Sequence, residues 1–382
     1  MRADRSSNGT LAQDPVSRAL INRLQSHIPL VGRPFLAIGN ELRLPEDEVV
    51  ERTQALIDAR IIREIGAIFD GRALGYDSCL VAAKYAPDDL ETAARVISTH
   101  PGVSHNYQRA HDFNLWYTLA VPPHRPLANE VDLLHRLTRA ESTRPLPAVR
   151  MFKLGVKLDM DETPADTRSG EPVSVAGTAG PQAPVEDEIA AVRAFQEPFA
   201  ISARPFEAPA ALHGFASAEA LLAVGEKLLR RGALRRFSAV LRHREAGFGA
   251  NGMAVWKASP EECSVAGPIM ASFAKVSHCY QRPVYEDWPY SLFTMIHGRT
   301  SEEVDDCISA LRRETGLREY QVLYSSVEYK KARVRYFGND WDMWRHDAEV
   351  AARADPARTA ANPRQVCPGP VPDPSKGTCQ VS

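Results

Sequence analysis

The chain has few cysteines, and none of them are clustered. Its 382 residues include six cysteines, and the closest pair, Cys367 and Cys379, is twelve positions apart. A structural zinc site or a disulfide scaffold needs cysteines at close and regular spacing, as in Cys-x-x-Cys. The sequence therefore predicts no resident metal site and no disulfide framework.

Long apolar runs and an excess of charge are also missing. No stretch reaches the ~18 apolar residues that a membrane-spanning helix needs, and residues 1–14 are polar rather than signal-like. The formal net charge is only −2, so no overall field draws the chain to nucleic acid or to an anionic membrane. We expect a cytoplasmic globular protein without a membrane partner.

What the chain does contain is a long internal repeat. The segment VSHNYQR at 103–109 returns 173 residues later as VSHCYQR at 276–282. Upstream, REIGAI at 63–68 is echoed by RRFSAV at 235–240. A repeat of this length indicates that a whole pair of domains is duplicated in one polypeptide, which makes a pseudo-dimer within one chain. We expect the function to lie where the two halves meet.

Each half is predicted to begin with helices and to end with strands. Apolar spacing predicts helices around 20–24 and 34–38 and from Pro45 onward, then a strand at 61–69, which is the pattern of a winged helix-turn-helix. A βαββαβ succession follows, typical of a ferredoxin-like sheet with helices on one face. In the first half its predicted elements are strand 79–85, helix 87–100, strands 103–109 and 115–121, helix 129–139 and strand 149–158. The second half repeats this order at 253–257, 260–273, 276–282, 291–296, 301–315 and 320–328.

The expected fold class is therefore α+β, a tandem duplication of winged helix-turn-helix plus ferredoxin-like βαββαβ domains. A polar stretch rich in Pro and Gly is typical of a flexible linker, and the end of the chain carries six prolines beyond Asp355. The predicted divisions are a disordered tail 1–16, winged-helix-like domain 17–70, ferredoxin-like domain 71–158, linker 159–185, winged-helix-like domain 186–238, ferredoxin-like domain 239–337 and a mostly disordered tail 338–382.

The helix-turn-helix suggests DNA binding, but its charges argue against it. A reading helix meets phosphates through its N-terminal residues. In the first half these are Glu46, Asp47, Glu48 and Glu51, and in the second half they are Ala-Glu-Ala at 218–220. Because acidic side chains repel phosphate, we expect a retired DNA-binding module and no specific nucleic acid partner.

A glycine-rich segment at 247–252 matches G-x-G-x-x-G letter for letter. A dinucleotide fingerprint must follow a strand and open a helix, whereas this segment leads into the predicted strand 253–257. We therefore interpret it as a turn between strands, or as a place where backbone lies close to a flat ligand.

The repeated strand carries the chemistry. Because side chains alternate along a strand, each copy should present a valine, a histidine, a tyrosine and an arginine on one face. These residues are Val103, His105, Tyr107 and Arg109 in the first half, and Val276, His278, Tyr280 and Arg282 in the second. The reach from histidine to arginine is about 13 Å, close to the width of a tetrapyrrole, and these residue types suit proton transfer and carboxylate binding. A polar interface between the halves is the plainer alternative.

A second cluster follows each copy of the repeat. His111 and Asn114 come after the first, and Tyr285, Trp288 and Tyr290 come after the second. A single histidine is more often structural than catalytic, but three histidines fall between residues 100 and 111. The aromatic residues fit ordinary packing equally well.

Longer motifs carry a resemblance to known families. The helix-turn-helix plus βαββαβ module resembles the Lrp/AsnC regulators, which bind small effectors between sheets at a dimer interface. The segments GAIFDGRALGYDSCLVA, PGVSHNYQRAHDFNLWYTLAVP, GFGANGMAVWK and VSHCYQRPVYEDWPYSLFTMIHG are similar to the siroheme decarboxylases. The two halves resemble the paired D and L subunits of that family fused into one chain, over roughly residues 17–337.

This resemblance implies a non-oxidative carboxy-lyase. The reaction would remove CO2 from the acetate side chains at C12 and C18 of siroheme to give 12,18-didecarboxysiroheme, which feeds haem d1 synthesis for denitrification and, in a sister branch, a route to haem b. No cofactor or metal is implied beyond the iron, which belongs to the substrate. Because the flanks of the two copies diverge, we expect one productive pocket between the sheets.

Roles follow for the residues of both clusters. The expected catalytic residues, which supply protons or clamp a reacting carboxylate, are His105, His111, His278 and Arg282. The expected substrate-binding residues, which enclose the macrocycle or hold its carboxylates, are Tyr107, Arg109, Asn114, Tyr280, Tyr285, Trp288 and Tyr290.

Two other functions stay open. A tetrapyrrole-responsive transcription regulator of Lrp/AsnC type would account for the helix-turn-helix, although the acidic reading helix argues against it. A non-catalytic haem carrier would account for the aromatic residues and a histidine ligand, but not for the repeated arginine. Siroheme is the expected partner, and other haem d1 biosynthesis proteins are further candidates.

Overall fold

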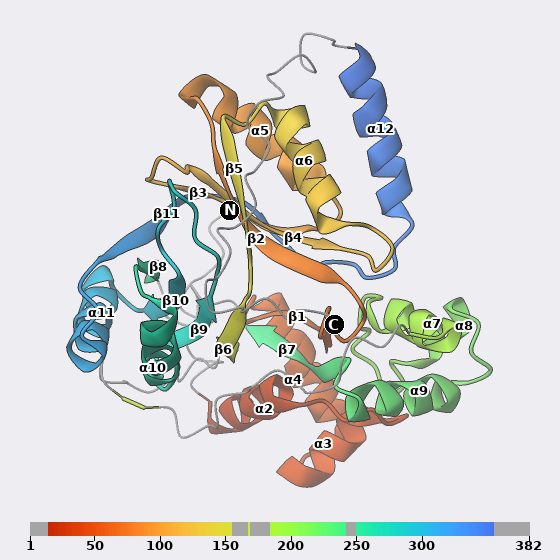
Figure 1. Ribbon diagram of the computed structural model, residues 1–382. Coiled ribbons are helices and arrows are strands. Elements are labelled where there is room, and N and C mark those ends of the chain that lie inside the picture. Colours follow the sequence, from red (N-terminus) through yellow and green to blue (C-terminus); the bar gives the residue numbers. More distant parts are fainter. Residues whose placement is uncertain (1–13, 155–166, 169–183, 242–249, 355–382) are drawn as a thin grey trace, which may run out of the picture.

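The computed structural model describes residues 14–154, 167–168, 184–241 and 250–354. Figure 1 shows two layers of strands and helices joined by shared strands, with the helical domains packed below them. Most of the predicted linker, residues 247–249 of the glycine-rich segment and the tail beyond 354 lie outside the described residues. No helix in the described ranges is long and apolar enough to cross a membrane.

The two helix-turn-helix domains pair through their wing strands. Their helices are α2 Pro15–Ser26, α3 Pro34–Leu42 and α4 Glu46–Asp58 in the first half, and α7 Glu186–Phe195, α8 Glu207–Leu212 and α9 Ala218–Arg230 in the second. Prolines in the first turns of α2 and α3 fix where these helices begin. The strands that follow, β1 Ile62–Phe69 and β7 Leu234–Leu241, form an antiparallel pair. The two domains therefore share one core, in which Phe35 and Phe237 are buried.

Each half then builds a ferredoxin-like domain, which confirms the predicted fold class. In the first half the elements are β2 Asp77–Lys84, α5 Pro87–Thr99, β3 Val103–Arg109, β4 Leu115–Val121, α6 Leu127–Thr138 and β5 Ser142–Pro147. In the second half they are β8 Ala250–Trp256, α10 Pro260–Ala271, β9 Val276–Gln281, β10 Leu292–Gly298, α11 Ser301–Thr315 and β11 Tyr320–Lys331. Ser259 and Glu262 form a capping box at the start of α10, so the local sequence sets this boundary.

The two halves exchange their last strands. Across the described part of the chain, nine strands form one sheet in the order β5-β2-β4-β3-β11-β8-β10-β9-β6. The first part of β11 pairs with β8 of its own half, and its second part pairs with β3 of the other half. In the first half, two separate strands make the same exchange. β5 pairs with β2 of its own half, and the strand that follows it, β6 Arg150–Leu154, pairs with β9 of the other half. Each half is therefore extended by a strand of the other.

The predicted strand 149–158 is present as β6, which the structure describes from Arg150 to Leu154, but the sequence analysis missed the strand before it. The last strand of the first half already begins at Ser142, and β6 crosses to the second half. Pro145 and Pro147 hid β5 from the sequence pattern, since proline is unusual within a sheet. Both are tolerated because β5 is an edge strand of the described sheet.

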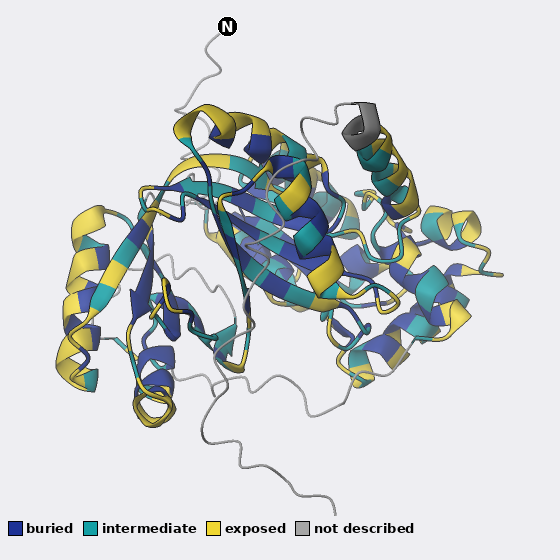
Figure 2. Ribbon diagram, turned by 45° about the horizontal axis from the view of Figure 1, so that its top comes forward, coloured by how far each residue is buried: buried dark blue, intermediate teal, exposed yellow. Residues whose placement is uncertain are grey.

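Helices cover the outer faces of the two paired layers. Helices α5 and α6 pack on the strands of the first half, and α10 and α11 on those of the second (Figure 1). Figure 2 shows exposed residues on the outward sides of these helices and buried residues on the strands beneath them. The inner faces of the two layers meet in a separate core that includes Trp116, Trp288 and Phe293. The space between the halves is thus a packed interface around which ligand-binding residues can be fixed.

The start of the tail 338–382 is ordered. It forms α12 Asp340–Ala354, which docks beside the first half (Figure 1). Trp341 is buried with its ring 4.8 Å from the buried His100 ring, and Arg345 forms an ion pair with the buried Glu130. The predicted tail therefore contains a docked helix at residues 340–354, and residues 355–382 lie outside the described part of the chain.

The strand exchange predicts that the halves hold together without a covalent link. If the chain is expressed as two polypeptides divided between residues 170 and 171, the pieces should associate, because β11·β3, β6·β9 and β1·β7 all join the halves. Size-exclusion chromatography should show one 1:1 complex, and thermal unfolding should show a single transition. Either piece alone would expose unpaired strand edges and should aggregate. Stable monomeric halves that do not associate would contradict this prediction.

Candidate active site

A ladder of histidine, tyrosine and arginine occurs once in each half. The first is His105, Tyr107 and Arg109 on β3, and the second is His278, Tyr280 and Arg282 on and directly after β9. The histidine and tyrosine rings lie 6.0 Å apart in the first copy and 6.2 Å apart in the second. The guanidinium carbon of Arg109 lies 5.8 Å from the ring centre of Tyr107, and that of Arg282 lies 4.8 Å from the ring centre of Tyr280. The structure therefore brings six of the predicted residues together as two matching sets.

The valine of the motif does not share this face, which corrects the predicted alternation. Val103 and Val276 pack in the cores beneath the helices, and Asn106 also faces α5, where it donates to a backbone carbonyl at 3.0 Å. The strand register slips directly after each valine, so that Ser104 and Ser277 are each one extra residue. A bulge of this kind interrupts the alternation of side chains along a strand. No local pattern in the sequence marks it.

Each bulge serine holds the ladder histidine beside it. Ser104 Oγ lies 2.9 Å from Nδ1 of His105, and Ser277 Oγ lies 2.7 Å from Nδ1 of His278. Burial lowers the pKa of His105 to about 4 and the pKa of His278 to about 3. Both imidazoles are therefore neutral at pH 7, and Nδ1 of each lies within hydrogen-bond distance of its serine.

The two ladder arginines reach across to the other half. Arg109 donates to the backbone carbonyl of Leu323 on β11, and Arg282 donates to that of Leu146 on β5. In both arginines Nε is buried and has no hydrogen-bond partner among the described residues. Burial lowers the pKa of both guanidinium groups to about 10, so they remain charged at pH 7. Because a buried cationic N–H without a partner is destabilising, a carboxylate ligand fits this position.

The wing strands bring further arginines to the ladders, which the sequence reasoning missed. Burial is the main cause that lowers the pKa of His105, and the positive charges of Lys331 and of Arg63 on β1 lower it further. In the second half, burial raises the pKa of Tyr280, and the positive charges of Arg235 on β7 and of Arg72 act in the opposite direction. Figure 1 shows β1 and β7 between the helical domains and the large sheet. The sequence does contain a sign of these arginines, because the upstream repeat places an arginine at 63 in one copy and at 235 in the other.

His111 and Asn114 lie in the turn after β3. The Asn114 amide is engaged at both ends by the backbone of Tyr85, because Oδ1 accepts from N at 3.0 Å and Nδ2 donates to O at 2.8 Å. This geometry favours a role in holding the turn. His111 Nδ1 accepts from Phe113 N at 2.9 Å, and its ring lies edge-on to Trp288 at 5.3 Å. His111 therefore borders the core between the halves rather than either ladder strand.

The aromatic residues of the second cluster belong largely to that same core. Trp288 is fully buried and lies edge-on to Trp116 and to Tyr290, with ring centres 5.1 Å apart in each case. Tyr285 donates its hydroxyl to the carbonyl of Pro145 on β5 at 2.6 Å. Packing thus accounts for these residues, except that the buried Nε1 of Trp288 has no hydrogen-bond partner in the described part of the chain.

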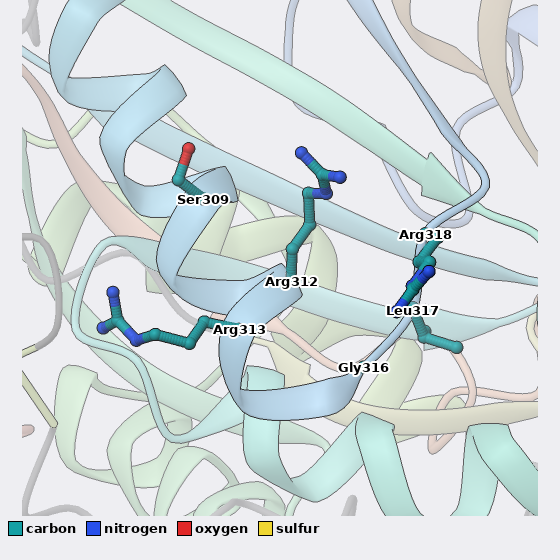
Figure 3. A pocket seen from close by; sticks show the side chains of 6 residues that line it. All are labelled: Ser309, Arg312, Arg313, Gly316, Leu317 and Arg318. Carbon is teal, nitrogen blue, oxygen red and sulfur yellow. The ribbon is translucent and has the colours of Figure 1, made fainter.

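A cavity of about 400 Å³ lies elsewhere, at the C-terminal end of α11. Figure 3 shows that its arginines, Arg312, Arg313 and Arg318, point in different directions. Basic side chains at the end of a helix balance the partial negative charge of its carbonyl groups. This cavity therefore needs no ligand to explain its composition, and it holds none of the predicted site residues.

Together the ladders offer neutral imidazoles, protonated phenols and charged guanidinium groups. Burial raises the pKa of Tyr107 and of Tyr280, so both phenols keep their protons. Within the described ranges, no group of three or more His, Cys, Asp or Glu side chains is arranged to hold a metal ion. The arrangement suits an anionic ligand that reacts by proton transfer.

Two family models match the chain. The siroheme decarboxylase NirDL-like HTH domain matches residues 17–63, and the AsnC-like ligand binding domain matches residues 73–153 and 245–330. The latter ranges contain both ladders. The matches agree with the order of domains in the structure.

Full-length relatives and solved structures are also similar. The siroheme decarboxylase of Hydrogenobacter thermophilus is 40% identical, over 85% of this chain and 96% of its own length. The siroheme decarboxylase NirDL subunit of Paracoccus denitrificans is 28% identical, over 83% of this chain and 95% of its own. Crystal structures of the siroheme decarboxylase NirDL, one of them in co-complex with an iron-uroporphyrin III analogue, match with 34% identity and a TM-score of 0.71, over 88% of this chain and 99% of theirs. The chain therefore belongs to the siroheme decarboxylase family.

Proposed function

We propose that this chain removes CO2 from the C12 and C18 acetate side chains of siroheme without oxidation, giving 12,18-didecarboxysiroheme for haem d1 biosynthesis. The observation that carries the proposal is the pair of ladders, each with a buried arginine Nε that has no partner among the described residues. The relatives named siroheme decarboxylase, and the NirDL structure with an iron-uroporphyrin III analogue, support the substrate class.

Binding falls to the arginines. Siroheme carries carboxylates around the rim of a flat macrocycle, so a site for it needs cations on more than one side. Arg109 and Arg282 offer buried Nε–H groups, where a charge-assisted hydrogen bond is strong because water does not compete. Arg63 and Arg235 on the wing strands add further positive charge. Each is already paired, Arg63 with Glu64 at 3.1 Å and Arg235 with Asp70 at 2.6 Å, so a substrate carboxylate would compete with these side chains. The family's retired DNA-binding module would then form one wall of the pocket.

Proton delivery falls to the ladder histidines. With no ligand bound, His105 and His278 are neutral because burial lowers their pKa. A serine hydroxyl that donates to Nδ1 favours the tautomer with the proton on Nε2, so each neutral imidazole can present an N–H to the substrate. When CO2 leaves, the electron pair of the broken C–C bond stays on the methylene carbon, delocalised into the pyrrole. The histidine then protonates that carbon to give a methyl group.

This scheme consumes one proton for each CO2 and transfers no electron to an acceptor. We therefore expect no resident metal and no redox cofactor, since the iron belongs to the substrate. Tyr107 and Tyr280, which keep their phenol protons, would wall the macrocycle and lower the local dielectric. We place the reaction in the cytoplasm, with other haem d1 biosynthesis proteins as candidate partners.

Turnover of siroheme tests the reaction directly. The purified protein, given siroheme anaerobically, should release two CO2 per substrate without a nucleotide, an added metal or an electron donor, because the ladders supply both charge and protons. Mass spectrometry of the product should show two carboxyl groups replaced by hydrogen. A strict requirement for one of those additions would refute the cofactor-free scheme. Siroheme that stays bound but unchanged would favour the carrier function instead.

The arginine clamp predicts a binding defect. Arg282→Lys keeps a charge but loses the planar fork, so it should raise the siroheme KM roughly 10- to 100-fold, the effect of losing a hydrogen bond to a charged group. Arg109→Lys tests the other half in the same assay. Arg313→Lys on the exposed side of α11 is the matched control and should leave KM unchanged. An unchanged KM in both ladder variants would remove the arginines from the binding site.

The regulator alternative predicts DNA binding, which the charges of α4 oppose. Glu46 is paired with Arg33, and Glu48 with Arg52 at 2.8 Å, so nearby cations are already engaged by carboxylates. Duplex binding in a gel-shift assay should be weak and without sequence preference even at low salt. A tight and sequence-selective shift would support a transcription regulator.

A further inference from the structure

The second half contains a hydrogen-bonded chain behind its ladder histidine. Ser277 Oγ lies 2.7 Å from Nδ1 of His278 and 2.8 Å from Nε2 of His297 on β10, both closer than its third partner, the carbonyl of Met295 at 3.2 Å. Ser277 is buried, whereas His297 is partly exposed. The chain therefore connects a residue that solvent can reach with the imidazole of the ladder.

The first half has no counterpart to His297. The backbone N–H of His297 donates to the carbonyl of Lys275 at 3.0 Å, and the N–H of Ala120 donates to the carbonyl of Gly102 at 2.9 Å. Lys275 and Gly102 each stand directly before the valine of the repeated motif, so Ala120 occupies the position that corresponds to His297. The serine and the ladder histidine occur in both halves, and the third member occurs in only one.

His278 is poorly suited to hold a proton between turnovers. Burial lowers its pKa, and His297, His105, Arg282 and Lys153 act in the same direction. An imidazole that does not retain a proton can still pass one on, because it accepts at one ring nitrogen while it donates from the other. His278 therefore needs a neighbouring group that supplies it with protons.

We propose that His297 and Ser277 form a proton relay that reloads His278 during decarboxylation, which makes the ladder of the second half the productive proton donor. This inference rests on the proposed function. His297 does not touch the reacting atoms in this scheme, so it is a relay residue rather than a catalytic one.

The relay balances atoms and charge. As the bond between the methylene carbon and the carboxylate breaks, CO2 leaves and the electron pair stays on carbon. His278 gives its Nε2 proton to that carbon, and its Nδ1 takes the hydroxyl proton of Ser277. Ser277 takes a proton from Nε2 of His297, and His297 regains one from water. The net input is one solvent proton per CO2, with nothing oxidised or reduced.

Two substitutions at one position separate a relay from a structural role. His297→Gln places an amide N–H near the position of Nε2, so it can still donate a hydrogen bond to Ser277 but cannot pass on a proton. Both His297→Gln and His297→Ala should therefore lower kcat for anaerobic siroheme decarboxylation by about 10²-fold, the scale of a lost proton-transfer group, with little change in KM. Added imidazole should restore activity to His297→Ala. His124→Gln, at an exposed position, is the matched control and should behave as wild type.

The outcomes distinguish the relay from the function on which it rests. Wild-type kcat in both variants, or a loss in His297→Ala that His297→Gln restores, would overturn the relay. Thermal unfolding and siroheme absorbance titrations of the same variants show whether the fold and the binding site survive. His278→Ala should also lose more kcat than His105→Ala, since only the second half has the relay, and equal losses would count against it. A wild-type chain that releases no CO2 would instead refute the proposed function.

Discussion

The exchange of last strands between the halves is the interaction on which the rest of the structure depends. Because β11 pairs with β3 and β6 pairs with β9, neither copy of the repeated strand has a free edge. The segments that lead into the exchanged strands supply the backbone carbonyls that hold the arginines of the other half, Leu323 for Arg109 and Leu146 for Arg282. Neither half can therefore complete its ladder alone. The candidate site is a property of the pseudo-dimer, whose cross-half contacts fix side chains that would otherwise repel one another or be solvated.

The helical domains have a structural reason to remain. Their wing strands β1 and β7 pair with each other, which joins the two domains across the pseudo-dimer and buries a common core. That pairing also fixes Arg63 and Arg235 on the side of the ladders, where their charges act on His105 and Tyr280. A carboxylate-rich ligand benefits from cations that are held rigidly before it arrives, since less order is lost on binding.

Much of the fold was predictable because its signals are local. The strands at 103–109 and 115–121 have the predicted bounds, since their apolar and polar residues form short uninterrupted runs. The bulge at Ser104, the edge strand hidden by Pro145 and the crossing of β6 were not predictable, because each depends on contacts with a distant segment. The same limit applies to the site. The repeat identified the ladder residues, whose roles stay predictions, but only the structure shows that Trp288 is buried in the core between the halves.

A fused chain can hold a difference that a symmetric dimer cannot. In a homodimer every residue occurs twice, so a histidine at the position of His297 would stand behind both ladder histidines. Duplication within one polypeptide removes that constraint, and here one half carries His297 while the other carries Ala120. The shared residues, an arginine and a tyrosine in each half, suit a ligand with carboxylates around its whole rim. In the proposed relay the unshared residue, His297, supplies protons, which are needed only where the reacting acetate lies. If both halves bind the substrate and only the second half returns protons, the ladders can be nearly identical while the residues around them differ.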